Sequence, residues 1–131
     1  MFQLDERFKN LLSIGELPGS LAFLFPDSDN PWCVLIPPVE NVREIHQLNE
    51  ERQVLLLKDI TRVSQFMEKE FLPTKINVGV LGNIVPQLHV HIICRFENDR
   101  AWPGPIWGTQ TKEDGKILSD RLSVFKKNLL F

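Results

Sequence analysis

The segment Gln87-Leu-His-Val-His-Ile-Ile93 decides how this chain is interpreted. Side chains alternate between the two faces of a β-strand, so the apolar residues at 88, 90 and 92 are expected to face the core. Gln87, His89 and His91 then share the opposite face. The pattern predicts a compact row of one primary amide and two imidazoles on one side of a sheet.

Imidazole is the side chain whose unperturbed pKa lies near neutrality, so neutral and charged forms are both accessible. A neutral imidazole can attack phosphorus while a second one donates or orients a proton. A His-x-His pair can instead bind a metal, although further ligands would have to come from His46 or scattered carboxylates. A hydrogen-bonded structural role is the third interpretation, and the spacing alone leaves all three open.

Outward from this segment, short apolar runs separated by turn residues predict antiparallel strands. The expected strands span residues 12–17, 21–25, 32–36, 76–81 and 88–96. Asn49 is a suitable N-cap for a long helix whose apolar stripe runs from Leu56 to Phe71, and Pro73 ends it. Apolar residues at 118, 122, 125 and 129 predict a C-terminal helix, and a short N-terminal helix is expected near Asp5. The fold class is therefore α+β, with a five-stranded antiparallel sheet.

Composition narrows the classes of partner. The 131 residues suit one domain, and a net charge of −2 argues against a broad electrostatic contact with nucleic acid or an anionic membrane. Cys33 and Cys94 lie in apolar runs and are expected to be buried free thiols in a reducing compartment. The N-terminal stretch lacks the apolar segment of a secretory signal, and no apolar run approaches a membrane span. A cytoplasmic protein is expected.

Residues 87–93 resemble the signature of the histidine-triad (HIT) superfamily, His-φ-His-φ-His-φ-φ with φ apolar, in which Gln87 occupies the first His position. The segments 32–37 and 42–48 are similar to the third strand of that family and to its lead into the long helix.

Further segments extend the resemblance. Asn77 and the Gly82-Asn83 turn look like the phosphate- and ribose-contacting segment that precedes the triad. Residues 102–108 resemble the tail of a bacterial HIT group that also carries Gln first. The resemblance covers about residues 10–108, with a tail and helix over 109–131, and implies a single HIT-like domain over 1–131.

The resemblance implies a nucleotide hydrolase or nucleotidyl transferase. His89 would attack the α-phosphorus and form a nucleotidyl-histidine, which water would then hydrolyse. His91 would contact phosphate oxygens and orient the nucleophile, and Gln87 would hydrogen-bond to the phosphate or the nucleophile. Members of the family are usually homodimers, need no cofactor and do not depend on a structural metal.

The chain departs from the family pattern at three positions. Trp32 matches an upstream His, Gln87 matches the first triad His, and Ile84 matches a Ser or Thr that contacts phosphate. Neither Trp nor Gln can carry a proton through a catalytic cycle. Because a phosphate leaving group departs near neutrality, we expect a preference for dinucleoside polyphosphates and similar anhydrides over nucleotide esters. The alternatives are a nucleotide-binding or regulatory module without turnover and a metal-binding protein that uses the two histidines.

Four further residues are candidates for nucleotide binding. Asn77, Asn83, Trp32 and Arg95 could contact phosphate, ribose or base. Their structural alternatives are a strand cap, a turn residue, a packed ring and a solvated strand-end charge, respectively. Trp102 and Trp107 either line a base pocket or pack against the core or a partner.

Overall fold

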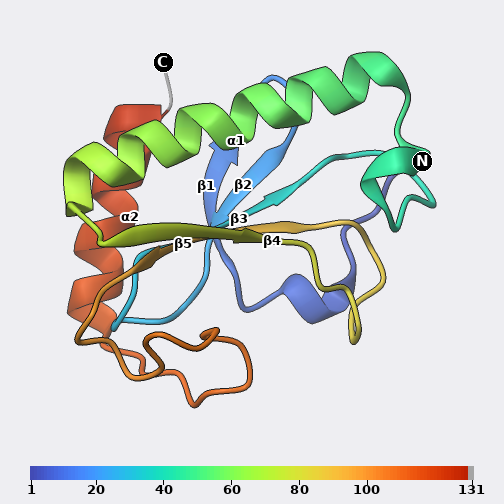
Figure 1. Ribbon diagram of the computed structural model, residues 1–131. Helices are drawn as coiled ribbons and strands as arrows, with labels where there is room; N and C mark the ends of the chain where they lie inside the picture. Colours follow the sequence, from blue (N-terminus) through green and yellow to red (C-terminus); the bar gives the residue numbers. More distant parts are fainter. Residues whose placement is uncertain (130–131) are drawn as a thin grey trace.

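One antiparallel sheet of five strands organises the molecule, in the order β1-β2-β3-β5-β4 (Figure 1). The computed structural model describes residues 1–129. Its strands are β1 (Leu12–Glu16), β2 (Leu21–Leu24), β3 (Trp32–Ile36), β4 (Lys75–Gly79) and β5 (Val90–Arg95). Its helices are α1 (Glu50–Phe71) and α2 (Gly115–Leu129), with short 3-10 turns η1 (Glu6–Phe8) and η2 (Ile45–Gln47). The predicted α+β architecture, with the long helix after the third strand, is confirmed.

Helix α1 forms where the sequence places its signals. The Asn49 side chain accepts a hydrogen bond from the backbone N–H of Arg52, which caps the first turn. The helix ends at Leu72, which adopts the left-handed conformation directly before Pro73. Its buried stripe, which includes Leu56, faces the sheet.

The two faces of the sheet are covered differently. Helices α1 and α2 lie on one face, where α1 crosses the strands (Figure 1) and packs with Leu35, Val90 and Ile92. The other face carries Trp32 and Val34, and it is covered by the N-terminal segment and by the loop between β5 and α2. The alternation predicted for residues 88–92 is confirmed, since Leu88 joins the helix-side core.

The expected N-terminal helix is a single 3-10 turn, η1, capped by the Asp5 side chain, which accepts from the backbone N–H of Arg7. The last two strands are shorter than predicted, because residues 80–89 form a connection rather than strand. Consequently His89 lies just before β5 begins at Val90. Within residues 1–129, neither helix has the combination of length and apolar character that a membrane span requires.

Candidate active site

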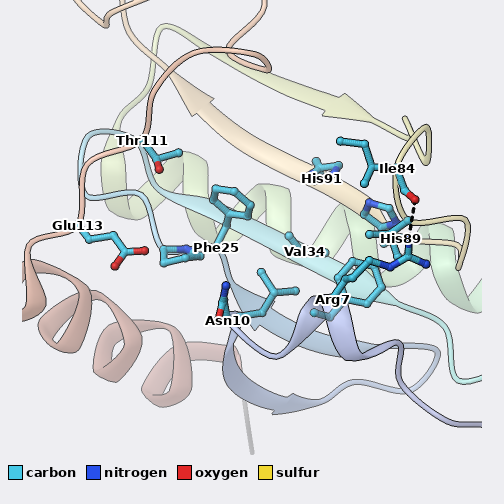
Figure 2. A pocket seen from close by; sticks show the side chains of 13 residues that line it. Arg7, Asn10, Phe25, Val34, Ile84, His89, His91, Thr111 and Glu113 are labelled. Atoms are coloured by element: carbon cyan, nitrogen blue, oxygen red, sulfur yellow. Dashed lines mark hydrogen bonds between the residues drawn. The ribbon is translucent and has the colours of Figure 1, made fainter.

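His89 and His91 lie side by side on the face of the sheet that no helix covers. Their ring centroids are 4.9 Å apart with an interplanar angle of 70°. His91 occupies the interior strand β5, paired with Val34 on one side and Gly79 on the other. Each imidazole is only 7% exposed, yet both line a cavity (Figure 2).

The tautomer of His89 is fixed by the backbone. Its Nδ1 lies 2.7 Å from the carbonyl oxygen of Gln87. A carbonyl only accepts, so Nδ1 carries the proton and Nε2 holds the lone pair of the neutral ring. Burial lowers the pKa of His89, opposed by that hydrogen bond, and the edge of Phe8 packs 4.8 Å from the ring centroid. His89 is therefore a neutral imidazole whose Nε2 carries the lone pair.

The tautomer of His91 is the opposite one, and Trp32 sets it. The Trp32 Nε1–H donates to His91 Nδ1 at 2.9 Å. An indole nitrogen only donates, so the His91 proton resides on Nε2. Burial, together with the neighbouring His89, lowers the pKa of His91 to about 4. His91 is thus a neutral N–H donor beside the neutral imidazole of His89.

Aromatic rings hold this pair in place. Trp32 is 3% exposed and stacks on Phe25 at 4.1 Å. Trp107 lies edge-on to His91 with centroids 5.6 Å apart. Gly79 makes room for it, because a Cβ at this position would lie 2.7 Å from the Trp107 ring. Trp107 therefore packs against the core beside His91, which is one of the two roles expected for it from the sequence.

Two cavities meet at the histidines. The first has a volume of about 370 Å³ and a mainly apolar lining. Its apolar residues include Phe8, Leu11, Phe25, Pro26, Val34 and Val85. The second, of about 300 Å³, is lined by Gly82, Asn83 and Trp107 in addition to residues shared with the first. His89 therefore borders both cavities.

Polar groups line opposite ends of the first cavity. Thr111 and Glu113 lie at one end, and Arg7 lies near His89 at the other (Figure 2). The sequence analysis missed Arg7 and Glu113, because the fold brings them to residue 89 from distant parts of the chain. No local signal in either segment marks them.

The Gln87 side chain lies elsewhere than expected. Its Nε2 donates to the carbonyl of Gln3 at 2.8 Å, and its Oε1 accepts from the backbone N–H of Asp5 at 2.9 Å. Strand alternation does not reach Gln87, since β5 begins three residues later. Gln87 does hydrogen-bond to His89, but through its main-chain carbonyl.

Arg95 and Asn77 lie outside both cavities, contrary to the nucleotide-binding role expected for them. Arg95 is 1% exposed and pairs with Asp99 at 2.8 Å, while its Nη1 donates to the Asn77 side chain. The loop after β5 covers the guanidinium, whose Nη2 donates to the carbonyl of Gly104. Trp32 acts from behind His91 rather than as part of the cavity lining, and Asn83 does border the second cavity.

In the part of the chain that the structure describes, the two histidines are not joined by further metal ligands. Over residues 1–129, no three His, Cys, Asp or Glu side chains gather where they could hold a metal ion. The lone pair of His91 already accepts from Trp32, so of the two imidazoles it is His89 that keeps a free lone pair.

The chain is similar in sequence and fold to several known proteins. A histidine triad protein from Marinobacter aquaeolei is 38% identical, with a TM-score of 0.94, over 98% of this chain and 96% of that one. A histidine triad protein from Bradyrhizobium japonicum is 37% identical, with a TM-score of 0.93, over 97% of each chain. A bis(5'-nucleosyl)-tetraphosphatase (asymmetrical) from Schizosaccharomyces pombe is 29% identical over 94 residues. The aligned region is 68% of this chain and 52% of that enzyme, so the match spans about half of the curated relative. Residues 9–98 match the HIT domain family, and the chain therefore belongs to it.

Proposed function

We propose that this protein hydrolyses dinucleoside polyphosphates, or related nucleotide anhydrides, through a nucleotidyl intermediate on His89. The observation that carries the proposal is the hydrogen bond from His89 Nδ1 to the Gln87 carbonyl, 2.7 Å long, beside the cavity. It leaves Nε2 as the nitrogen with the lone pair, the form that a nucleophile requires. Membership of the HIT family and the similarity to a tetraphosphatase support a nucleotide substrate.

The proposed reaction has two displacements. The His89 Nε2 lone pair forms a bond to the α-phosphorus, and the bond from that phosphorus to the bridging oxygen breaks. The leaving nucleotide keeps the electron pair. Water then attacks the same phosphorus, the N–P bond breaks, and the nucleoside monophosphate leaves while one proton passes to solvent. His91 would donate its Nε2–H to a non-bridging oxygen, whose negative charge it stabilises in each displacement.

The cavity suits a nucleoside beside the reacting phosphorus. Its volume of about 370 Å³ and its aromatic and aliphatic lining fit a base and ribose. Asn10 and Thr111 line the same cavity and offer polar groups to hydroxyls or base edges.

The geometry favours anhydrides over esters. The Gln87 amide is held by the N-terminal backbone, and the Trp32 indole is engaged with His91. Neither group can protonate a departing amine or alkoxide. A polyphosphate leaving group needs little protonation near neutrality, because its second pKa is about 6.

The direct test is to trap the intermediate. Incubation with diadenosine tetraphosphate, acid-free quenching and intact-mass spectrometry should reveal one added AMP that is lost on acid treatment. The adduct should be absent from His89→Gly and present in His46→Gly, a matched change at an exposed histidine. Tight AMP binding without an adduct or released product would contradict turnover and favour the binding module.

We also propose that two copies of the chain associate through β4. This strand lies at the edge of the sheet, and its neighbourhood exposes Val78, Leu81 and Ile84. An unpaired edge beside exposed apolar side chains is a ready template for pairing with a second copy. Light scattering on the purified protein should give the mass of a dimer, and a Val78→Lys variant should give that of a monomer.

A further inference from the structure

The geometry points to Arg7 as the residue that binds the phosphates of the leaving group, and to Gln87 as the residue that holds the N-terminal segment in place for it. This inference rests on the proposed function, which it deepens by assigning the part of the substrate that decides specificity.

Arg7 lies at the end of the first cavity that contains His89 (Figure 2). Among the residues that line the two cavities, all of them within the described part of the chain, it is the one Lys or Arg. A polyphosphate carries several negative charges, so a cation beside the reacting phosphorus is the partner that it requires.

The guanidinium is held in a fixed orientation. Its Nε and Nη2 donate to the two carboxylate oxygens of Asp5 at 3.0 and 2.8 Å, and Nη1 donates to the carbonyl of Ile84 at 2.9 Å. These bonds use three of its five N–H groups and leave one on each terminal nitrogen. The side chain remains 52% exposed, so an anion can reach those two donors.

Asp5 serves as the support for Arg7. Hydrogen bonds from Arg7 lower the pKa of Asp5 to about 2, so the carboxylate stays ionised over the whole neutral range. Asp5 compensates part of the arginine charge, and one N–H on each terminal nitrogen of Arg7 remains for an anion. Two N–H groups on one guanidinium can bind two phosphate oxygens at once, which gives geometric selectivity.

Gln87 connects this support to the catalytic segment. Its two amide hydrogen bonds reach the backbone of Gln3 and Asp5, on the segment that carries Arg7. Arg7 in turn donates to Ile84, on the connection that leads back to Gln87. The N-terminal segment and residues 84–87, which lead into His89, are therefore tied together at two points.

The charges in the cavity also give the substrate a direction. Glu113 lines the end opposite Arg7 and disfavours phosphate there, whereas a carboxylate accepts hydrogen bonds from ribose hydroxyls or base N–H groups. The nucleoside bonded to the attacked phosphorus should therefore extend toward Glu113, and the remaining phosphates toward Arg7. An AMP ester of a phenol has no further phosphate and cannot use Arg7.

The experiment compares two substrates with the full chain. Diadenosine tetraphosphate offers a polyphosphate leaving group, and the 4-nitrophenyl ester of AMP offers a phenolate. The measured quantity is the ratio of their kcat/KM values, which removes effects common to both substrates. Arg7→Gln should lower the ratio roughly 10- to 100-fold, because a charge-assisted hydrogen bond to phosphate is lost. Arg7→Lys should restore part of it.

Gln87→Leu should lower the same ratio by a smaller factor and accelerate hydrogen exchange at the Asp5 amide, which it leaves without an acceptor. Arg52→Gln, the same charge change on α1 across the sheet, is the matched control and should leave the ratio unchanged. An Arg7→Gln ratio equal to that of the unmodified protein would overturn the assignment, as would an equal fall in the control.

Binding separates this inference from the proposed function. The α,β-methylene analogue of diadenosine tetraphosphate and AMP are titrated calorimetrically into each variant. Arg7→Gln should weaken binding of the analogue roughly tenfold and leave AMP unchanged. If this contrast is seen but no adduct forms on His89, the proposed hydrolase activity is contradicted and the Arg7 site is supported. If the adduct forms but Arg7→Gln binds the analogue as tightly as the unmodified protein does, the Arg7 site is contradicted and the hydrolase is supported.

Discussion

The polar side chains at the two ends of β5 are used in different ways. At the beginning of the strand, Nδ1 of His89 and Nδ1 of His91 each make a hydrogen bond to another protein group. Within residues 1–129, neither Nε2 has a hydrogen-bond partner. At the far end, the Arg95 guanidinium makes four hydrogen bonds to Asp99, Asn77 and Gly104. All three side chains are almost fully buried, with 1–7% of their surface exposed.

Strand phase and burial therefore do not separate the histidines from a structural residue here. The difference lies in the cavity space beside the side chain. The imidazoles border cavities, whereas Arg95 is closed over by the loop that carries Trp102, whose ring centroid is 5.8 Å from Cζ. Arg95 uses four of its five N–H groups and borders neither cavity, so it stabilises the fold, whereas a spare donor or lone pair beside a cavity is available for a ligand.

The largest effect is expected at the structural end. Arg95→Leu leaves the Asp99 carboxylate buried without its cation, and breaking one side of a buried pair costs about 3–5 kcal/mol. Burial opposes ionisation of Asp99, but hydrogen bonds from Arg95 and the backbone hold its pKa well below the usual range. Urea denaturation should therefore show a large fall in the free energy of unfolding.

The double variant Arg95→Leu with Asp99→Leu is the control for that prediction. It should recover part of the lost stability, because no unpaired charge remains. An Arg95→Leu protein that keeps its full stability but loses turnover would break the comparison, since Arg95 would then act in the site.

Asn77 tests the same end with a milder change. Asn77→Ala removes the acceptor of one Arg95 N–H, which should lower the free energy of unfolding by about 1–2 kcal/mol. Turnover of diadenosine tetraphosphate under conditions where the variant is fully folded should stay within about twofold. A raised KM at unchanged stability would instead restore the nucleotide-binding role expected from the sequence.

The sequence reveals features that depend on residues close together in the chain, and it does not reveal those that depend on distant ones. Strand and helix periodicity are local, so the sheet, α1, α2 and the orientation of Leu88, Val90 and Ile92 were predictable. Strand alternation also predicted that His89 and His91 share one face. Both predictions depend on residues within a few positions of one another.

The remaining features depend on long-range contacts, which periodicity does not encode. Asp5 is hydrogen-bonded to Gln87 across 82 residues and Arg7 to Ile84 across 77. The closure over Arg95 needs a loop whose path the sequence does not specify. The strand was expected to begin at residue 88, and its actual start at Val90 moved Gln87 out of phase. Trp32 was recognised as unable to carry protons, but its donation to His91 follows only from the register of β3 and β5.

At the reactive end, Trp32→Phe sharpens the comparison. The indole N–H stabilises the neutral form of His91, so its loss should raise the pKa of His91 above the value of about 4 in the unmodified protein. Loss of the preferred tautomer should lower kcat/KM roughly 3- to 10-fold. Imidazole nitrogen shifts followed against pH by NMR would report both the pKa and the tautomer.

Trp107→Phe is the matched change for Trp32. It keeps an aromatic ring beside His91, and the Trp107 Nε1 has no hydrogen-bond partner among the described residues. The pKa of His91 should stay near its value in the unmodified protein. A shift as large as that of Trp32→Phe would assign the change in the His91 pKa to altered packing rather than to the lost hydrogen bond.

The smallest expected effect is a pH dependence that is nearly absent over the neutral range. Protonation of Nε2 would remove the His89 lone pair, so kcat/KM should fall as pH drops through the pKa of that ring. Burial places this pKa below 6.5, which means that more than half of the rings remain neutral at pH 6.5. Between pH 8 and 6.5, kcat/KM for diadenosine tetraphosphate should therefore change by less than about twofold, with the steep fall below that range. A tenfold loss over the same interval would mean that a group of ordinary or raised pKa controls the reaction. The neutral state of His89 would then not be what governs the reaction.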